Sequence, residues 1–163
     1  MTNTEALLEK FIEKAETEQT SCIKIDKEAF KNILREQNFD FVNLNTPFKS
    51  FNKGCEFDEA GIKNAIVGAD FAIAETGTSV IDSTDEKIRL ATTLAENLFI
   101  ALHSSNIVAK LENIVSYMNE KNSADNAYLA FITGPSRTAD IERVLTIGVH
   151  GPVSLTCYII QDL

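Results

Sequence analysis

Residues 74–79 bring together, in one short stretch, the side-chain types that a site for a polar ligand needs. Glu75 supplies a carboxylate that can act as an acid, a base or a hydrogen-bond acceptor, and Thr76 and Thr78 supply hydroxyl groups. Gly77 allows a tight turn and a close approach of the backbone to a ligand. The same residues also fit a purely structural turn whose hydroxyls satisfy nearby backbone groups, so both interpretations stay open.

Residues 133–140 form a second polar segment, with the composition of an anion-binding loop. Its turn-forming and polar residues include Gly134, Ser136, Arg137, Thr138 and Asp140. Free backbone N–H groups at the start of a helix favour an anion, and the planar fork of Arg137 can grip a carboxylate or phosphate with two hydrogen bonds. The alternative is that Arg137 pairs with Asp140 or Glu142 inside the protein.

A third segment, residues 148–152, is a turn that carries His150, one of two histidines in the chain. Histidine titrates near neutral pH and can serve as an acid, a base or a ligand. A single histidine in a turn is more often a hydrogen-bonded structural residue. His103, beside two serines, is the weaker candidate of the two.

The charge balance narrows the classes of partner. The chain has 163 residues with 15 Lys and Arg against 24 Asp and Glu, which gives a formal net charge of −9. Nucleic-acid binding is not expected, because proteins that grip phosphate backbones depend on basic side chains. No stretch reaches the roughly 20 apolar residues of a membrane span, and residues 1–18 lack the apolar core of a secretory signal. We expect a cytoplasmic protein without a membrane partner.

Several familiar catalytic signatures are missing from the sequence. It contains no G-x-G-x-x-G, Walker P-loop, G-x-S-x-G or H-E-x-x-H motif. Its three cysteines, Cys22, Cys55 and Cys157, are far apart and never form a C-x-x-C pair. We therefore expect free thiols, no metal site and no iron–sulfur cluster on this chain.

The hydrophobic pattern predicts helices that alternate with short apolar strands. Thr2 and Glu5 have the spacing of a capping box before the first helix, as Ser83 and Glu86 do further on. The predicted helices cover residues 4–18, a stretch from Asp26 that includes Phe30, Ile33 and Leu34, then 58–67, 83–94 and 106–121. Residues 22–25 form a short apolar segment. The predicted strands cover residues 39–44, 71–74, 98–102, 127–133, 144–149 and 153–160, with an irregular connection at 46–58.

This alternation predicts a three-layer α/β fold with a mostly parallel sheet flanked by helices. A chain of this length suggests a single domain over residues 1–163, with the helix in residues 1–20 docked on its body. Ligands of such sheets bind outside the carboxyl ends of the strands. Phe48, Phe51 and Phe57 fall in the irregular connection, so we expect an exposed aromatic patch there, at a surface for a partner or for self-association.

Two blocks of the sequence resemble the motifs of the LUD, or lactate utilisation, family. The blocks are IVGADFAIAETGTSVIDS at 66–83 and TGPSRTADIERVLTIGVHGP at 133–152, and Arg89 and Leu94 stand where the family has a basic residue and a leucine. The resemblance implies the fold shared by ribose-phosphate isomerases, glucosamine-phosphate deaminases and CoA-transferases. It also implies a part in the oxidation of L-lactate to pyruvate beside iron–sulfur subunits.

Two functions follow from this resemblance. In the first, the protein is an accessory subunit that binds a small carboxylate between the two loops. Arg137 would hold the carboxylate, Ser136 and Thr138 would donate hydrogen bonds, and His150 would shape the second loop. In the second, it is an independent enzyme of the CoA-transferase or sugar-phosphate isomerase type with Glu75 as nucleophile.

The chain departs from the family pattern at three positions. Ala95 and Leu98 stand where the family often has Pro and His, and Val153 stands where a basic residue is common. The missing histidine removes one polar group from the site. These departures suggest a divergent member that acts on another substrate.

Overall fold

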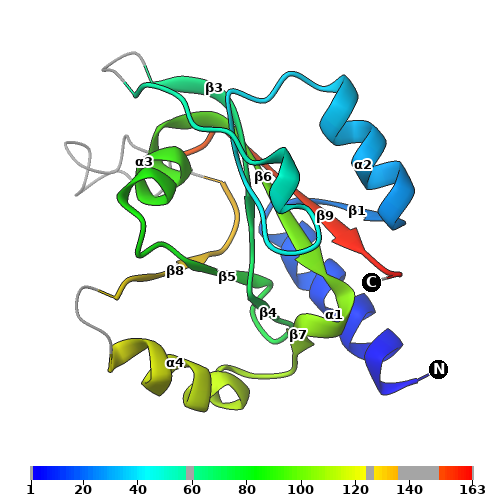
Figure 1. Cartoon of the computed structure of the whole chain (residues 1–163). Helices are drawn as coiled ribbons and strands as arrows, with labels where there is room; N and C mark the ends of the chain where they lie inside the picture. The colour runs from blue at the N-terminus through cyan, green and yellow to red at the C-terminus, as the bar shows by residue number, and fades with distance from the viewer. Residues whose placement is uncertain (1, 58–60, 124–126, 136–150, 163) are drawn as a thin grey trace.

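The parallel sheet predicted from the sequence forms the centre of the molecule (Figure 1). The computed structural model describes residues 2–57, 61–123, 127–135 and 151–162. Five strands lie in the order β1-β9-β6-β3-β2, and each hydrogen-bonded pair is parallel. Their bounds are β1 Ser21–Ile25, β2 Phe41–Asn43, β3 Ile62–Gly68, β6 Ala95–His103 and β9 Ser154–Ile160.

A second sheet of four strands, which the sequence did not predict, packs beside the first. Its order is β7-β4-β5-β8. The strands are β4 Phe71–Ile73, β5 Thr78–Asp82, β7 Ile107–Val108 and β8 Leu129–Ile132. Strand β5 runs antiparallel to both β4 and β8, so residues 74–77 form the turn of a β-hairpin. The predicted segment 71–74 is therefore a hairpin strand of this second sheet.

In the described part of the chain, four α-helices surround the two sheets. They are α1 Asn3–Thr17, α2 Lys27–Glu36, α3 Glu86–Leu94 and α4 Val115–Asn122. Three short 3-10 helices, η1 Lys49–Phe51, η2 Ser104–Asn106 and η3 Leu111–Ile114, lie in the connections. The predicted capping box at the start of α1 is confirmed, since Thr2 accepts from the N–H of Glu5 and the Glu5 side chain accepts from the N–H of Thr2.

Alternate residues of the central strands face two separate cores, which gives the fold its three layers. On β3, Ala65 and Val67 pack in the core that contains α1 and α3, while Ile66 packs in the core under α2. Strands β6 and β9 alternate in the same way. A strand buried on both faces reads as a continuous apolar run, as these strands do. The predicted three-layer α/β fold is confirmed.

Two of the predicted helices are wrong. Within residues 58–67, the described part is strand β3 from Ile62 onward. Residues 106–121 are η2, β7, η3 and α4 in succession rather than one helix, because Ile107 and Val108 pair with β4. The predicted cap is also displaced, since Asp85 rather than Ser83 accepts a hydrogen bond at the start of α3, from the N–H of Lys87. The predicted strand at 144–149 lies outside the described residues.

The expected aromatic surface patch is wrong as well. Phe48 is 3% exposed and packs edge-on against Phe30, with ring centroids 4.8 Å apart. Phe51 contacts the same core, and Phe57 packs against Phe41 in the other one. These rings close the cores beneath the irregular connection, where they exclude water from the sheet. None of the helices that the structure describes is long and apolar enough to cross a membrane.

Candidate functional site

The two polar segments predicted from the sequence meet at one pocket of about 540 Å³, which we call the motif pocket. It is lined by Lys14, Glu18, Glu75, Thr76, Thr78, Thr133 and Pro135. Strands β5 and β8 are hydrogen-bonded neighbours, which brings the residues just before β5 next to those just after β8. The sheet thereby joins segments that are far apart in the sequence.

A chain of three hydroxyl groups crosses the motif pocket. The Oγ1 atoms of Thr76 and Thr78 are 2.7 Å apart, and those of Thr78 and Thr133 are 2.6 Å apart. A hydroxyl group both donates and accepts, so such a chain can present a donor at one end when an acceptor binds there. Thr78 is 6% exposed and is held by both neighbours, whereas Thr76 is exposed at the pocket.

Gly77 explains why the N-terminal helix contributes to this pocket. Its φ of +69° lies in the left-handed region, where glycine is favoured. A Cβ built on Gly77 would lie 2.6 Å from the backbone nitrogen of Ala15 and 2.8 Å from the carbonyl carbon of Lys14. The hairpin turn therefore sits directly on the last turns of α1, and the absence of a side chain at Gly77 places Lys14 beside the threonines.

The pocket contains charges of both signs. Lys14 supplies an ammonium group in the last turn of α1, and Glu18 and Glu75 supply carboxylates. Glu75 is exposed, and its backbone N–H donates to the carbonyl oxygen of Ala109 at 3.1 Å. This bond fixes the backbone at Glu75 and leaves the carboxylate at the mouth of the pocket. The arrangement can bind a small polar molecule through one cation, one or two carboxylates and the hydroxyl chain.

Arg89, also predicted to bind substrate, does not line the motif pocket and bonds to nearby backbone groups. Its guanidinium donates to the carbonyl oxygens of Ser83 and Thr84 at 2.8 and 3.0 Å. The same group lies 5.2 Å from the ring centroid of Tyr128. Arg89 therefore fastens the connection between β5 and α3 to the residues before β8, away from the residues that line the motif pocket.

The other predicted site residues fall into two groups. Gly134 is described, has a φ of +76° and lies between Thr133 and Pro135 at the motif pocket. Five candidates lie outside the described residues: Ser136, Arg137, Thr138, Asp140 and His150. Of the positions that depart from the family pattern, Ala95 and Leu98 are buried in the core, and Val153 is 73% exposed.

Sequence reasoning missed the contribution of α1. Lys14 and Glu18 belong to a helix whose pattern indicated only an amphipathic element docked on the body. Nothing local in the sequence links them to Glu75. The signal that they share a site is Gly77, because a glycine in a hairpin turn can admit another backbone at close range.

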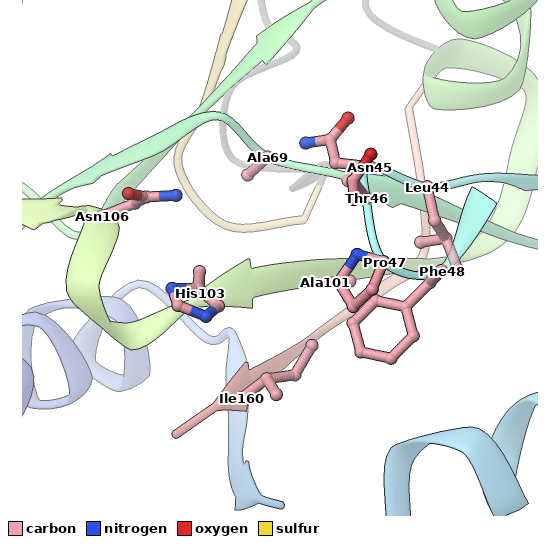
Figure 2. A pocket seen from close by; sticks show the side chains of 11 residues that line it. Leu44, Asn45, Thr46, Pro47, Phe48, Ala69, Ala101, His103, Asn106 and Ile160 are labelled. Atoms are coloured by element: carbon pink, nitrogen blue, oxygen red, sulfur yellow. The ribbon is translucent and has the colours of Figure 1, made fainter. Parts of the chain in front are cut away.

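A second pocket, of about 210 Å³, lies at the carboxyl ends of β2, β3, β6 and β9, and we call it the sheet-edge pocket (Figure 2). Its lining consists of Leu44, Asn45, Thr46, Pro47, Phe48, Gly68, Ala69, Ala101, His103, Asn106 and Ile160. This is the edge at which parallel sheets bind ligands. His103, which ranked last among the sequence candidates, lines it.

A polar cluster lies between the second sheet and α4. Asp70 accepts hydrogen bonds from the Asn45 amide at 3.1 Å and from the Tyr117 hydroxyl at 2.5 Å, and Lys121 pairs with Asp82 at 2.8 Å. Burial and the bond to Asp70 raise the pKa of Tyr117. Partial burial acts to raise the pKa of Asp82, but hydrogen bonds from Lys121 and Thr84 outweigh it and lower that pKa. These bonds tie α4 to the sheet.

Within the described ranges, no three His, Cys, Asp or Glu side chains come together as a metal site would need. The three cysteines do not form a disulfide with one another, and burial raises the pKa of Cys22 to about 12.

Comparison with known proteins decides the family. The model of the LUD domain matches residues 13–160, which include both motif segments and the end of α1 that lines the motif pocket. The chain belongs to the LUD domain family. The match extends well beyond the two motif blocks and begins at residue 13, within the C-terminal part of α1.

Curated proteins from several bacteria are similar in sequence to this LUD domain. It is 35% identical over 100 residues to "Lactate utilization protein C" of Geobacillus sp. (strain WCH70), a match that covers 60% of this chain and 42% of that protein. It is 34% identical over 101 residues to the protein of that name from Bacillus pumilus (strain SAFR-032), with coverage of 60% and 42%. An uncharacterized protein of Escherichia coli (strain K12), YkgG, is 33% identical over 103 residues, with coverage of 61% and 45%. The chain thus spans under half the length of these relatives.

One solved structure has the same fold as this LUD domain. It is the crystal structure of a DUF162 family protein from Deinococcus radiodurans. The TM-score is 0.69 at 17% identity, and the match covers 98% of this chain and 99% of that one. At this level of identity the match shows a shared fold, and it covers both sheets.

Proposed function

We propose that this LUD domain binds a small monocarboxylate in the motif pocket and takes part in lactate utilisation. The observation that carries the proposal is the hydroxyl chain of Thr76, Thr78 and Thr133 beside the ammonium of Lys14. Hydrogen bonds from charged or hydroxyl donors are the means by which a carboxylate is held outside water. The names of the curated relatives support lactate as the first ligand to test.

The charges of the pocket favour a particular kind of acid. Lys14 can pair with one carboxylate, while Glu75 and Glu18 repel a second one. A hydroxyl group on the ligand can instead donate to the exposed carboxylate of Glu75. We infer that a 2-hydroxy monocarboxylate such as L-lactate binds more tightly than pyruvate, which lacks this donor, and that dicarboxylates bind poorly.

Isothermal titration of the chain with L-lactate, pyruvate and malate tests this proposal. Lys14→Gln should weaken lactate binding about tenfold or more, the size of one charge-assisted hydrogen bond. Lys10→Gln is the matched control, because Lys10 is an exposed lysine of the same helix that does not line the pocket, and it should bind as the parent does. Equal lactate affinity in the two variants would refute the assignment of the pocket.

Glu75→Gln tests whether Glu75 causes the preference for lactate over pyruvate, separately from the affinity of the pocket for carboxylates in general. This variant keeps the size of the side chain but removes its negative charge. It should bind pyruvate at least as well as the parent and lose the preference for lactate. An unchanged ratio of the two affinities would show that Glu75 does not contact the hydroxyl group of the ligand.

We further propose that the chain works as an accessory subunit beside iron–sulfur proteins of lactate oxidation. The support is family membership together with the names of the curated relatives. Affinity purification from the native host followed by mass spectrometry should recover iron–sulfur oxidoreductase subunits. Repeated recovery of this chain alone would contradict the accessory role while leaving carboxylate binding untouched.

The alternative function is an independent enzyme in which Glu75 attacks an acyl thioester. Its support is that Glu75 lines the same pocket as the hydroxyl chain. The carboxylate would form an acyl-glutamyl anhydride and release the thiolate of coenzyme A. Borohydride trapping after incubation with an acyl-CoA should then label the parent but not Glu75→Ala. Equal labelling of both proteins would exclude this reaction.

A further inference from the structure

We propose that the sheet-edge pocket is a second binding site, separate from the motif pocket, for a small uncharged planar molecule that carries a carboxamide or a similar donor–acceptor pair. The pocket lies at the carboxyl ends of four parallel strands and takes its lining from five parts of the chain. Its volume of about 210 Å³ equals that of roughly seven water molecules in the liquid. This size suits a single ring with one polar substituent.

One residue of the pocket lining carries a buried hydrogen-bonding atom without a partner among the described residues. The Nδ1 atom of His103 bonds to the hydroxyl group of Ser105, whereas its Nε2 atom is buried and has no partner among the described residues. A buried polar atom without a partner is uncommon in folded proteins and needs an explanation. His103 lines the pocket, and a small shift of its imidazole would bring Nε2 against a bound ligand as the missing partner. Figure 2 shows Asn106 beside His103 on one side of the pocket.

Asn45 completes the polar part of the pocket. Its amide nitrogen donates to Asp70 at 3.1 Å. A Cβ built on Gly68 would lie 3.0 Å from that nitrogen and 3.1 Å from the Cγ atom, so the Asn45 amide rests closely on the Gly68 backbone. Held in this way, the amide keeps its oxygen as an acceptor. A ligand N–H can donate to it, while a ligand carbonyl accepts from Asn106 or His103.

The charge of the surroundings excludes an anion. None of the eleven described residues that line this pocket is Asp, Glu, Lys or Arg. A carboxylate placed here would be buried without a cation, which is costly. Asp70 next to Asn45 adds repulsion. A neutral carboxamide meets neither obstacle.

The shape of the walls favours a flat ligand. Figure 2 shows the rings of Pro47 and Phe48 on the side opposite to His103. Gly68, Ala69 and Ala101 contribute small side chains to the lining. Aromatic and ring side chains pack well against the face of a planar molecule. We therefore use benzamide as the probe, with benzoate as its charged counterpart and cyclohexanecarboxamide as its non-planar counterpart.

The test follows the imidazole signals of His103 by NMR during titration of the full chain. The chain has two histidines, so comparison with His103→Gln assigns them. Benzamide should shift the His103 signals in a saturable way with a Kd of about 1 mM or tighter. Benzoate and cyclohexanecarboxamide should each bind at least tenfold more weakly. No saturable shift, or benzoate binding as tightly as benzamide, would overturn the proposal.

Two variants test which of the two pockets benzamide occupies. Asn106→Ala removes one amide and should weaken benzamide binding at least fivefold, while Thr76→Val in the motif pocket should leave it unchanged. L-Lactate at saturating concentration should not displace benzamide, because the two pockets share no lining residue. Displacement by lactate, or equal loss in both variants, would refute a separate site. Failure of lactate to bind at all would concern the motif pocket alone.

Discussion

Replacement of Gly77 by alanine tests the central feature of the site, which is the contact between the hairpin turn and α1. The new Cβ would meet the backbone nitrogen of Ala15 at 2.6 Å, the carbonyl carbon of Lys14 at 2.8 Å and the Ala15 Cα at 2.9 Å. Real Cβ atoms do not approach other atoms so closely. All three are helix backbone atoms, and Ala15 is 0% exposed, so relief requires the helix and the hairpin to separate.

Two separate costs contribute to the expected loss of stability. An L-residue in the left-handed conformation costs about 1–2 kcal/mol relative to its favoured conformations, and the φ of +69° places Gly77 there. Forcing an extra carbon into a packed contact costs about 1–3 kcal/mol. Together they predict that Gly77→Ala lowers the free energy of unfolding by about 2–5 kcal/mol. For a chain of this size, each kcal/mol lowers Tm by about 2–4 °C.

Equilibrium unfolding in urea measures this loss, and Gly54→Ala is the matched control. A Cβ at Gly54 meets nothing within 4 Å and its φ is not positive, so this variant should differ from the parent by less than about 1 kcal/mol. Gly77→Ala should also weaken lactate binding, because it moves Lys14 away from Thr76 and Thr78. If the two alanine variants have the same stability, the turn does not rest on α1 and the reasoning fails.

Three further predictions concern stability and reactivity. Lys121→Gln should lower the free energy of unfolding by about 1 kcal/mol at pH 7, a value reduced for the partial exposure of the ion pair with Asp82. The difference from the parent should disappear as the pH falls below about 4, because Asp82 is then protonated in both folded proteins. An equal difference at pH 2.5 and pH 7 would contradict this prediction. Phe11→Ala, at a residue that is 0% exposed in the core beneath α1, should lower the free energy of unfolding by about 3–5 kcal/mol, and a loss below 1 kcal/mol would show that α1 is not docked. Iodoacetamide at pH 8 should modify partly exposed Cys55 well before buried Cys157, because burial raises the pKa of Cys157 far above its ordinary value. Mass spectrometry of the native protein measures the order of modification. Early modification of Cys157 would contradict this prediction.

Local signals in the sequence predicted the helices and strands that depend on local physics. Thr2 and Asp26 cap α1 and α2, and each accepts the backbone N–H three residues ahead. Such bonds involve neighbours in the chain, so residue types at a fixed spacing reveal them. The strands β6 and β9 were also predicted, because short apolar runs bounded by polar and turn residues fit strands buried on both faces.

The failure at residues 106–121 has a long-range cause. The apolar residues there follow helical spacing, but Ile107 and Val108 form a strand that pairs in parallel with β4. Once they are in the sheet, the chain turns through η3 before it forms α4, and Leu111 and Val115 are left 46% exposed. Periodicity cannot reveal this, because the pairing partner lies in another part of the chain. The tertiary contact overrides the local preference of the segment.

The failure at residues 58–67 is an ambiguity of short apolar runs. Ala65, Ile66 and Val67 are consecutive and each is at most 1% exposed. A run of this length fits a turn of buried helix as well as a buried strand, and only the neighbouring strands β2 and β6 decide between them. The motif segments avoided this problem, because turn residues mark the loops whatever elements flank them.

The site shows the same division between local and long-range information. Glu75, Thr76 and Thr78 could be found because they are close in the sequence, but Lys14 joins them only through the tertiary packing of α1, which includes the contact at Gly77. This matters on a chain with a net charge of −9. At 0.1 M salt the Debye length is about 10 Å, so the distant carboxylates are largely screened while a lysine in contact with the ligand is not. An anion can therefore bind at one place on an acidic surface, and packing of a helix against a glycine puts the cation there.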